Sequence, residues 1–560
     1  MSNVNLSELF KEEGEFRFLR GGDTLLVSKT LGQHIYLLVA GRVAALDQPK
    51  EGPARVVAVY RPGAIIGAAE FLSGDRHSTS LTALRDSELQ VLSYTALESI
   101  SSAHPELLAE LARVSFARRR EQTIQTLRKA SILGFVAVCD SVAMRALVES
   151  LAARMRAQGA SVAVLGAGAE SSPPTYLSDL EAQHDYVLMA AERQDFDFTQ
   201  YCGRQIDRLV LVGSAHSPLP DGPLSFAAVA IKRHRLLDFI LVQPENTKRP
   251  ANSTRWLAAA PVARLFQIRK DDIGDLDRLA RVFTGRSVGV VLSGGGARAY
   301  AHIGVLHALE ELGIGVDFVA GTSMGAVIAA GVAMGWSMEE LDRRIRDAFV
   351  SSSPLSDIAF PLLAMTRGGE VERRLEAHFG DVEISDLWRP FTCVSTDLTT
   401  GYLYAHRSGM LRKALRASIS LPGILPPVVL DGHVLVDGAL VRNLPTDLMR
   451  EQHDGLTIGV DVAGASGLRP DELMLKPSGL RWLTSGAWLK GPPIVSVLIR
   501  SATLPAARVT EVGVREALDV TINPQLDNVQ LRDWKSYDPA VTAGYKAAME
   551  KRDLLTSADM

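Results

Sequence analysis

Short apolar runs separated by glycine turns dominate the first hundred residues of the chain. Between residues 16 and 93 they read TLLV, HIYLLV, GRVAAL, ARVVAVY, GAIIG and LQVL. Brief β-branched runs with this spacing are typical of a small β-barrel or jelly roll. Two helical stretches follow, Tyr94–Ser102 and Pro105–Arg128, and the second ends in a charged run that indicates a solvated linker helix. The pattern predicts an N-terminal β domain with a linker helix over residues 1–130.

The pattern changes at about Ser131. Apolar runs such as GFVAVCD, SVAVLG, DYVLMAAE, DRLVLVG and LDFILVQ alternate with helical stretches such as Val142–Gln158. This alternation predicts a parallel sheet covered by helices, in a central α/β domain over residues 131–285. No Walker loop follows the first strand, and Gly166-Ala167-Gly168 is too short to indicate a dinucleotide site, so the role of this domain is left open.

A third α/β domain is expected over residues 286–463, beginning with the strand SVGVVLS, and a C-terminal extension that packs on it is expected over residues 464–560. The longest apolar run, Val319–Trp336, approaches the length of a membrane span, but glycines and Ser323 interrupt it. It predicts a buried strand-turn-helix, with a membrane helix as the alternative.

The composition of the chain excludes several classes of protein. The chain has 560 residues, 47% hydrophobic and 22% charged, which fits three or four folded units and excludes a disordered or fibrous protein. A net charge of −4 provides no overall positive field for nucleic acid. Cys139, Cys202 and Cys393 lie far apart, without the spacing of a disulfide framework or a zinc site. The acidic N-terminus does not resemble a signal peptide, so we expect a cytoplasmic protein.

The motif that best indicates chemistry is Gly321-Thr322-Ser323-Met324-Gly325, which has the pattern G-x-S-x-G. It lies between a predicted strand, Val316–Ala320, and a predicted helix, Ala326–Met334. A serine on a sharp strand-to-helix turn needs glycines on both sides, because side chains there would collide with the backbone. The motif predicts that Ser323 is a nucleophile at the positive end of a helix, and a tight packing turn is the alternative.

A second glycine motif, Gly294-Gly295-Gly296-Ala297-Arg298, ends the preceding strand. Successive glycines expose backbone N–H groups, which suits a phosphate or the oxyanion of an acyl-transfer intermediate. A phosphate loop is disfavoured because no Lys-Ser/Thr follows and Ala299 replaces the third glycine of G-x-G-x-x-G. We expect an oxyanion hole at Gly294, Gly295 and Gly296. Arg298 either lies close to the oxyanion or pairs with a carboxylate.

A serine nucleophile also needs a base. Asp437, in VLVDGALVRNLP, is followed by a glycine that lets the chain turn and the carboxylate point into a cleft. His406, His433 and His453 could complete a Ser-His-Asp triad, although none lies in a recognisable turn. A Ser323–Asp437 dyad is the preferred interpretation, and a triad is the alternative. No metal motif such as H-E-x-x-H occurs, and the expected chemistry needs neither metal nor cofactor.

The ordered motifs Gly-Gly-Gly-x-Arg, Gly-x-Ser-x-Gly and Asp-Gly-Ala resemble those of patatin-like phospholipases. Further matches are Ser395-Thr396-Asp397 ahead of Thr400-Gly401, the run Arg416–Gly423, and Asn443 with Pro445. The resemblance implies a Ser323–Asp437 dyad, an oxyanion hole from the amides around Gly294–Gly296, and hydrolysis of acyl esters in lipids. Ala299 stands where many members have glycine, at a helix start that tolerates alanine.

The N-terminal β domain resembles cyclic nucleotide-binding domains through its turn glycines, Gly67 among them, and the cassette Arg76-His77-Ser78-Thr79. The resemblance implies that Arg76 would hold a cyclic phosphate, with Gly67 and Thr79 as neighbouring contacts. Ala68 follows Gly67 where the family usually has the glutamate that binds the ribose, and Glu70 lies two positions later. A docking module that retains the fold without the ligand is the alternative.

The order of the domains resembles the catalytic region of the neuropathy target esterase family, which implies a lysophospholipase or phospholipase. The expected fold class is a multidomain α+β and α/β protein, with an N-terminal β-barrel or jelly roll, a central parallel-sheet domain and a patatin-like α/β hydrolase domain.

The expected partners follow from the same resemblance. They are a phospholipid or lysophospholipid substrate, a transient membrane surface with the protein peripheral on it, and a cyclic nucleotide as a candidate ligand, but no nucleic acid. Trp482, Leu483, Trp488, Lys490 and Arg500 could form an interfacial patch, with core packing as the alternative. A non-catalytic scaffold and a carboxylesterase acting on small soluble esters are the competing functions.

Overall fold

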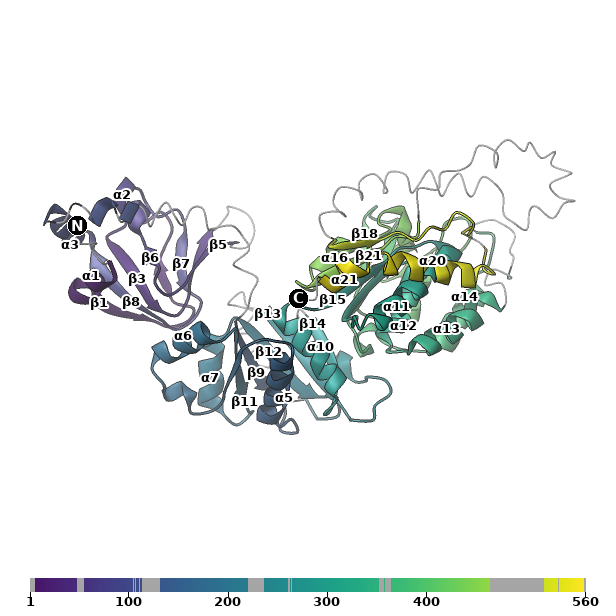
Figure 1. Ribbon diagram of the computed structural model, residues 1–560, viewed down its shortest axis with the longest axis horizontal. Coiled ribbons are helices and arrows are strands. Elements are labelled where there is room, and N and C mark those ends of the chain that lie inside the picture. Colours follow the sequence, from purple (N-terminus) through teal and green to yellow (C-terminus); the bar gives the residue numbers. More distant parts are fainter. Residues whose placement is uncertain are drawn as a thin grey trace, which may run out of the picture. The chain divides into compact units, whose positions relative to one another are not determined.

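Two compact units make up the chain, residues 1–242 with 255–264 and residues 243–254 with 265–560 (Figure 1). The computed structural model describes residues 6–47, 55–103, 105, 107–109, 111–112, 131–219, 236–259, 262, 264–351, 357, 364–463, 518–531 and 533–557. Within these ranges, no helix has the length and apolar character needed to cross a membrane.

The N-terminal part of the first unit consists of two four-stranded antiparallel sheets, ordered β1-β8-β3-β6 and β2-β7-β4-β5. Each apolar run singled out in the sequence contains a strand, and inward-facing side chains such as Tyr36, Leu38 and Val43 form a core. The predicted helix after Ser93 is confirmed, whereas the linker helix falls mostly outside the described residues. The elements are α1 (Leu6–Glu13), β1 (Glu15–Leu19), β2 (Thr24–Leu26), β3 (His34–Ala40), β4 (Val43–Asp47), β5 (Arg55–Tyr60), β6 (Ile65–Ile66), α2 (Ala68–Ser73), β7 (Ser80–Ala83), β8 (Ser87–Ser93) and α3 (Tyr94–Ala103).

The rest of the first unit is built on a six-stranded sheet in the order β10-β11-β9-β12-β13-β14, where β14 spans Arg264–Arg269. Strands β10, β11, β9, β12 and β13 run parallel. Every residue of β9 and β11 is buried, which explains why these strands read as continuous apolar runs rather than alternating ones. The elements are β9 (Ile132–Ala137), α5 (Met144–Ala157), β10 (Val162–Leu165), α6 (Pro174–Gln183), β11 (Tyr186–Ala191), α7 (Phe196–Gln205), β12 (Arg208–Ser214) and β13 (Leu236–Gln243).

A cluster of buried charges joins the antiparallel sheets to the parallel sheet within this unit. Arg85 donates from Nη1 to Glu181 Oε2 at 2.8 Å and pairs with Asp207 Oδ2 at 2.6 Å. Arg42 donates to Asp207 Oδ1 at 2.9 Å and also pairs with Glu181, while the Ser131 amide donates to Asp207. Burial opposes ionisation of Asp207, but the charges of Arg85 and Arg42 hold its pKa well below the usual range.

The second unit is built on an eight-stranded sheet in the order β19-β20-β17-β16-β15-β21-β22, with β18 paired to β17. Strands β17, β16, β15, β21 and β22 run parallel, and β18, β19 and β20 add antiparallel pairs at one side. The strands are β15 (Val288–Leu292), β16 (Phe318–Thr322), β17 (Phe391–Asp397), β18 (Leu403–His406), β19 (Val428–Leu430), β20 (His433–Asp437), β21 (Leu456–Val460) and β22 (Val520–Ile522).

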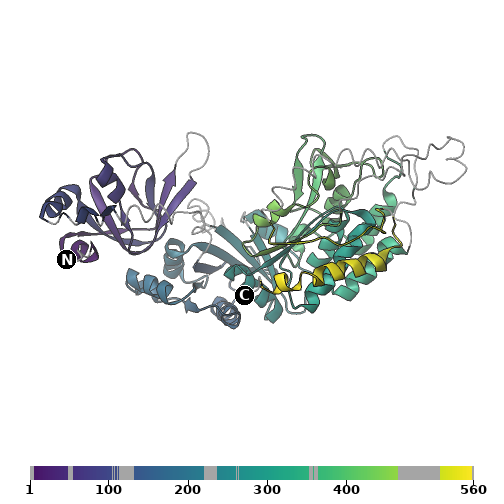
Figure 2. The same ribbon diagram turned by 45° about the horizontal axis from the view of Figure 1, so that its top comes forward.

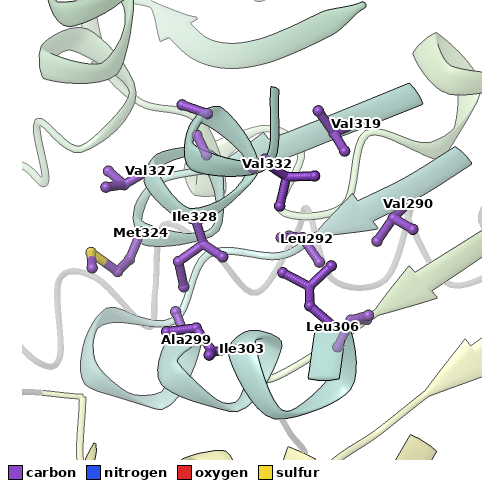
Figure 3. Packing of buried hydrophobic residues seen from close by; sticks show 14 of the residues in the cluster. Val290, Leu292, Ala299, Ile303, Leu306, Val319, Met324, Val327, Ile328 and Val332 are labelled. Carbon is purple, nitrogen blue, oxygen red and sulfur yellow. The ribbon is translucent and has the colours of Figure 1, made fainter. Parts of the chain in front are cut away.

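Helices cover this sheet and form the main core with it. Figure 3 shows Val290 and Leu292 of β15 facing Ile303 and Leu306 of α11, beside Ile328 of α12. Every residue of α12 is buried, and with β16 it confirms that the longest apolar run is a strand-turn-helix. The helical elements from residue 253 onward are α9 (Ser253–Ala259), α10 (Ile273–Thr284), η3 (Gly296–Tyr300), α11 (Ala301–Glu311), α12 (Met324–Ala333), α13 (Met338–Ile345), the π-helix η4 (Arg346–Val350), α14 (Gly369–Phe379), η5 (Ile384–Asp386), α15 (Leu411–Ser418), η6 (Gly438–Leu440), α16 (Thr446–Arg450), α20 (Tyr537–Met549) and α21 (Arg552–Ser557).

The C-terminal helix α20 lies alongside α11 (Figures 1 and 2). Two glycines allow the backbones to touch, because a Cβ on Gly304 would lie 1.9 Å from the Val541 carbonyl oxygen. A Cβ on Gly544 would lie 1.8 Å from the Ala301 carbonyl oxygen. Helix α11 begins shortly after the motif Gly294–Arg298, which we call the glycine-rich loop. The contact between α11 and α20 therefore helps to hold the helix that supports this loop.

Candidate active site

Ser323 occupies the turn between β16 and α12. Its backbone has φ 54° and ψ −128°, a left-handed φ that costs free energy for a residue with a side chain. The turn presents the hydroxyl at the N-terminus of α12, where the helix dipole is positive. This is the strained strand-to-helix geometry that the G-x-S-x-G pattern predicts.

The two flanking glycines are required by contact distances. A Cβ on Gly321 would lie 2.7 Å from the Ala326 amide nitrogen, and a Cβ on Gly325 would lie 2.4 Å from the Ser293 carbonyl oxygen. Carbon atoms do not approach backbone atoms this closely without displacement. The serine turn therefore packs against the end of β15, where the glycine-rich loop begins.

Asp437 ends strand β20 and lies directly against the serine. The Ser323 hydroxyl donates to Asp437 Oδ2 at 2.6 Å, and the Ala439 amide donates to Oδ1 at 2.9 Å. Asp437 pairs with Ser395 of β17, and β17 pairs with β16, the strand that leads to Ser323. This pairing brings Asp437 close to Ser323. Asp437 is 2% exposed, and burial raises its pKa to about 6 although both hydrogen bonds favour the ionised form.

The backbone amide of Ser323 is already hydrogen-bonded. It donates to Ser418 Oγ at 3.0 Å, and the Ser418 hydroxyl donates in turn to the Val394 carbonyl at 2.7 Å. Ser418, at the end of α15, therefore fixes the Ser323 turn against β17. The sequence motif Arg416–Gly423 contains this serine, but nothing in the pattern indicated its partner.

The glycine-rich loop is held at Gly294 by Asn443. The Gly294 amide donates to Asn443 Oδ1 at 3.0 Å, and Asn443 Nδ2 donates back to the Gly294 carbonyl at 3.2 Å. A Cβ on Gly294 would lie 2.9 Å from Ser323 Cβ, so the loop and Ser323 are adjacent. Among the hydrogen bonds of the described residues, none uses the amide of Gly295 or Gly296 as donor.

Further contacts hold the two ends of the loop. His302, fully buried in the first turn of α11, bonds through Nε2 to the Ser293 carbonyl at 2.8 Å, and burial lowers its pKa to about 4, so a neutral ring is the donor. The Ala297 amide donates to the Leu531 carbonyl at 2.9 Å. Arg298 donates to the carbonyls of Val529 at 2.7 Å and Ala463 at 3.1 Å.

The histidines considered for a triad lie elsewhere. His406 bonds to Ser395 Oγ at 2.9 Å, and His433 Nδ1 lies 2.8 Å from Asp397 Oδ2. His453 contacts Ser287 and Thr457. Burial lowers the pKa of His406 and of His453 to about 4. In the part of the chain that the structure describes, none of the three bonds to Ser323 or Asp437.

The residues expected to contact a cyclic nucleotide lie around α2. Gly67 caps its N-terminus with φ 87°, and the exposed Arg76 donates from Nη1 to the Lys29 carbonyl at 2.9 Å. Thr79 is half-buried just before β7. Glu70 lies in α2 with its carboxylate 3.8 Å from His77 Nδ1, so it approaches the cassette histidine.

The site described above includes neither the expected interfacial patch nor a metal-binding group. Trp482, Leu483, Trp488, Lys490 and Arg500 fall outside the described residues. No group of three or more His, Cys, Asp or Glu side chains suited to a metal ion occurs among the residues described.

Sequence reasoning did not assign roles to Asn443, His302 or the C-terminal residues around Leu531. Asn443 carries the only local signal, because it follows Asp437 by six positions in a segment already singled out. The contacts of His302 and Leu531 come from tertiary packing and leave no short motif.

Comparison with known proteins gives two domain matches. Residues 290–450 match the family model described as patatin-like phospholipase, and residues 16–104 match the cyclic nucleotide-binding domain. The first match contains Ser323, Asp437 and most of the residues that hold them.

Full-length relatives extend the similarity to nearly the whole chain. An uncharacterised NTE family protein of Mycobacterium tuberculosis is 32% identical over 92% of this chain and 88% of its own. Patatin-like phospholipase domain-containing protein 6 of Mus musculus is 28% identical over 91% of this chain and 43% of its own. Neuropathy target esterase sws of Drosophila melanogaster is 27% identical over 94% of this chain and 42% of its own.

Proposed function

The chain belongs to the NTE family, and from this membership and the site geometry we propose that it is a serine lipid acyl hydrolase using a Ser323–Asp437 dyad. The observation that carries the proposal is the 2.6 Å hydrogen bond from the strained Ser323 hydroxyl to a buried carboxylate. Membership of the family implies an esterase or lipid hydrolase. The finer assignment, to a lysophospholipase or phospholipase, is our proposal.

In the proposed reaction, Ser323 Oγ attacks the ester carbonyl carbon while its proton passes to Asp437 Oδ2. The amides of Gly295 and Gly296 donate to the oxyanion of the tetrahedral intermediate, and the positive end of α12 adds to this stabilisation. The alcohol leaves with the proton from Asp437, and an acyl-enzyme remains. Water then attacks the acyl-enzyme by the same route and releases the fatty acid.

The electrostatics of Asp437 suit a base. An exposed aspartate has a pKa near 3.9 and is a weak base at neutral pH. Burial raises the pKa of Asp437 to about 6, which keeps the group ionised at pH 7 while strengthening its affinity for the serine proton.

We also propose the domain organisation that the sequence predicts. Residues 1–130 would form a regulatory barrel or jelly roll, supported by two antiparallel sheets and the cyclic nucleotide-binding match. Residues 131–285 would form the central α/β domain, residues 286–463 the catalytic domain, and residues 464–560 an extension packed on it. We propose a phospholipid or lysophospholipid substrate that the enzyme meets while peripheral on a membrane, and a cyclic nucleotide as the candidate regulator.

The test is release of fatty acid from lysophosphatidylcholine by the wild type, Ser323→Ala and Asp437→Asn. We expect the wild type to be active and each variant to lose about 10³-fold or more of its rate. Ser351→Ala and Asp381→Asn are matched controls, because both residues are exposed and neither contacts the site. Wild-type rates in either site variant would refute the dyad.

Rates measured on micellar and on soluble esters, with and without a cyclic nucleotide, distinguish the lipid hydrolase from the competing functions. A rate that rises sharply when the substrate passes into micelles supports a lipid hydrolase, whereas equal rates on small soluble esters indicate a carboxylesterase. Absence of hydrolysis together with failure of a fluorophosphonate to label Ser323 would favour a non-catalytic scaffold. Parallel assays with cyclic AMP and cyclic GMP test the regulatory role.

A further inference from the structure

Arg298 connects the glycine-rich loop to two segments that are far apart in the sequence. Its Nε donates to the Val529 carbonyl at 2.7 Å, and its Nη1 donates to the Ala463 carbonyl at 3.1 Å. Ala463 follows β21, and Val529 lies between β22 and α20. The planar guanidinium presents its donors in a fixed fork, so one side chain can hold both carbonyls in a defined geometry.

The neighbouring residues of the loop touch the same C-terminal segment through their backbone. The Ala297 amide donates to the Leu531 carbonyl at 2.9 Å. Gly296 has φ 55°, and a Cβ at this position would lie 2.2 Å from the Leu531 carbonyl oxygen. The peptide groups of Gly295 and Gly296 are therefore shaped by a segment that lies more than two hundred residues later in the chain.

Arg298 lies in a partly desolvated place, with one acidic side chain nearby. Burial lowers its pKa, and the nearby carboxylate of Asp527, which belongs to the same C-terminal segment, opposes that effect. A guanidinium that holds two backbone carbonyls has a structural use at this position. In the alternative, a direct bond from Arg298 to the oxyanion or to a lipid phosphate would use donors other than the Nε–H and Nη1–H that hold the Val529 and Ala463 carbonyls.

We propose that Arg298 is a positioning residue that ties the segment around Val529–Leu531 to the glycine-rich loop and thereby aims the Gly295 and Gly296 amides at the oxyanion. The inference rests on the proposed function and deepens it, because it makes the C-terminal segment part of the catalytic machinery. Donors that stabilise an oxyanion act through their alignment, so a displacement of about 1 Å is enough to cost about 10²-fold in rate.

The test compares Arg298→Lys and Arg298→Ala in the full-length protein. Lysine keeps the charge but cannot reproduce the fork, so we expect both variants to lose about 10²-fold in kcat with KM within about threefold of wild type. Hydrogen exchange at the Ala297 amide, which the Leu531 carbonyl protects, should accelerate in both. A lysine variant with wild-type kcat, beside an inactive alanine variant, would mean that the charge acts directly and would overturn the proposal.

Arg389→Lys is the matched control. Arg389 makes the same kind of fork, from Nε to the Val316 carbonyl and from Nη1 to the Val332 carbonyl, both at 2.8 Å, away from the glycine-rich loop. We expect this variant to lose stability while its folded fraction keeps the wild-type kcat. If Arg389→Lys lowered kcat as much as Arg298→Lys, a general loss of packing would explain both and the proposal would fail.

Failure of the proposed function gives a different result. If the wild type hydrolysed no ester, the exchange measurement would still decide whether Arg298 holds the segment. Unchanged protection of the Ala297 amide in Arg298→Ala would overturn the positioning role whatever the activity.

Discussion

Asp437 is the residue whose ionisation should set the pH dependence of the reaction. Its pKa is raised to about 6 by burial, and only the ionised form can accept the Ser323 proton. We therefore expect kcat to rise with pH, with a midpoint near 6, and to level off above pH 7. A pH–rate profile with a non-ionisable ester substrate checks this, and a midpoint near 4 would show that the carboxylate is not desolvated during catalysis.

The raised pKa of Asp437 also makes the folding stability depend on pH, and this dependence runs opposite to that of the activity. Because the folded-state pKa of Asp437 lies above its unfolded value, folding favours the protonated form. The stabilising effect of protonation is present below about pH 4 and is lost as the pH rises through 6. Activity and this local contribution to stability are therefore opposed near neutral pH.

A substitution at Gly325 tests the contact between the Ser323 turn and the end of β15. In Gly325→Ala the new methyl group would lie 2.4 Å from the Ser293 carbonyl, so the turn must move. We expect loss of about 10²-fold or more in kcat. Gly313→Ala is a less crowded control, since nothing lies within 4 Å of its Cβ position although its φ of 73° is left-handed. Equal losses in both variants would attribute the effect to glycine replacement in general.

The sequence allowed the main residues to be predicted because their geometry is encoded locally. The strained turn at Ser323 and the loop at Gly294–Gly296 require glycines at fixed spacing, and those glycines are visible in the sequence. The predicted strand before the turn ends two residues too early and the helix begins two residues too late, because the left-handed φ of Ser323 lets α12 start directly after it. The partners of the loop, Asn443, His302 and Leu531, come from tertiary contacts and carry no local pattern.

At the scale of elements, the pairing of α11 with α20 is the contact most sensitive to a small substitution. In Gly544→Ala the added Cβ would lie 1.8 Å from the Ala301 carbonyl oxygen, so the helices must separate. We expect a cost of about 3 kcal/mol in the free energy of unfolding of the second unit, and a lower kcat because α11 supports the glycine-rich loop.

Gly203→Ala is the control for this substitution. Gly203 lies in α7, and nothing lies within 4 Å of its Cβ position, so alanine should be neutral or slightly stabilising there. Denaturant unfolding of the three proteins, followed with hydrogen exchange in α11, measures the difference. Wild-type stability in Gly544→Ala would contradict the close approach of the two helices.

At the scale of the whole molecule, the buried charges of Arg85, Glu181 and Asp207 should determine how the first unit unfolds. Arg85→Ala leaves two carboxylates without their main partner, which typically costs about 3–5 kcal/mol. We expect the antiparallel sheets and the parallel sheet to lose exchange protection together in this variant. Arg85→Ala with Asp207→Asn should recover part of the loss, because it removes one unpaired charge.

The depressed pKa of Asp207 gives this cluster a defined pH range. Its stabilising contribution is present above the unfolded value near 4 and is lost as the pH falls toward the depressed folded value. The destabilisation by Arg85→Ala should therefore be larger at pH 7 than at pH 3. A cost that does not change with pH would show that the cluster acts through packing alone.

The contacts of the glycine-rich loop with Val529, Leu531 and α20 also affect when the active site can form during protein synthesis. A ribosome delivers Ser323, Asp437 and the loop well before it delivers these last partners, and N-terminal regions fold first during synthesis. The growing chain would thus carry Ser323 and Asp437 before the Gly295 and Gly296 amides are held in place. Hydrolysis would therefore begin only after the late segment has docked.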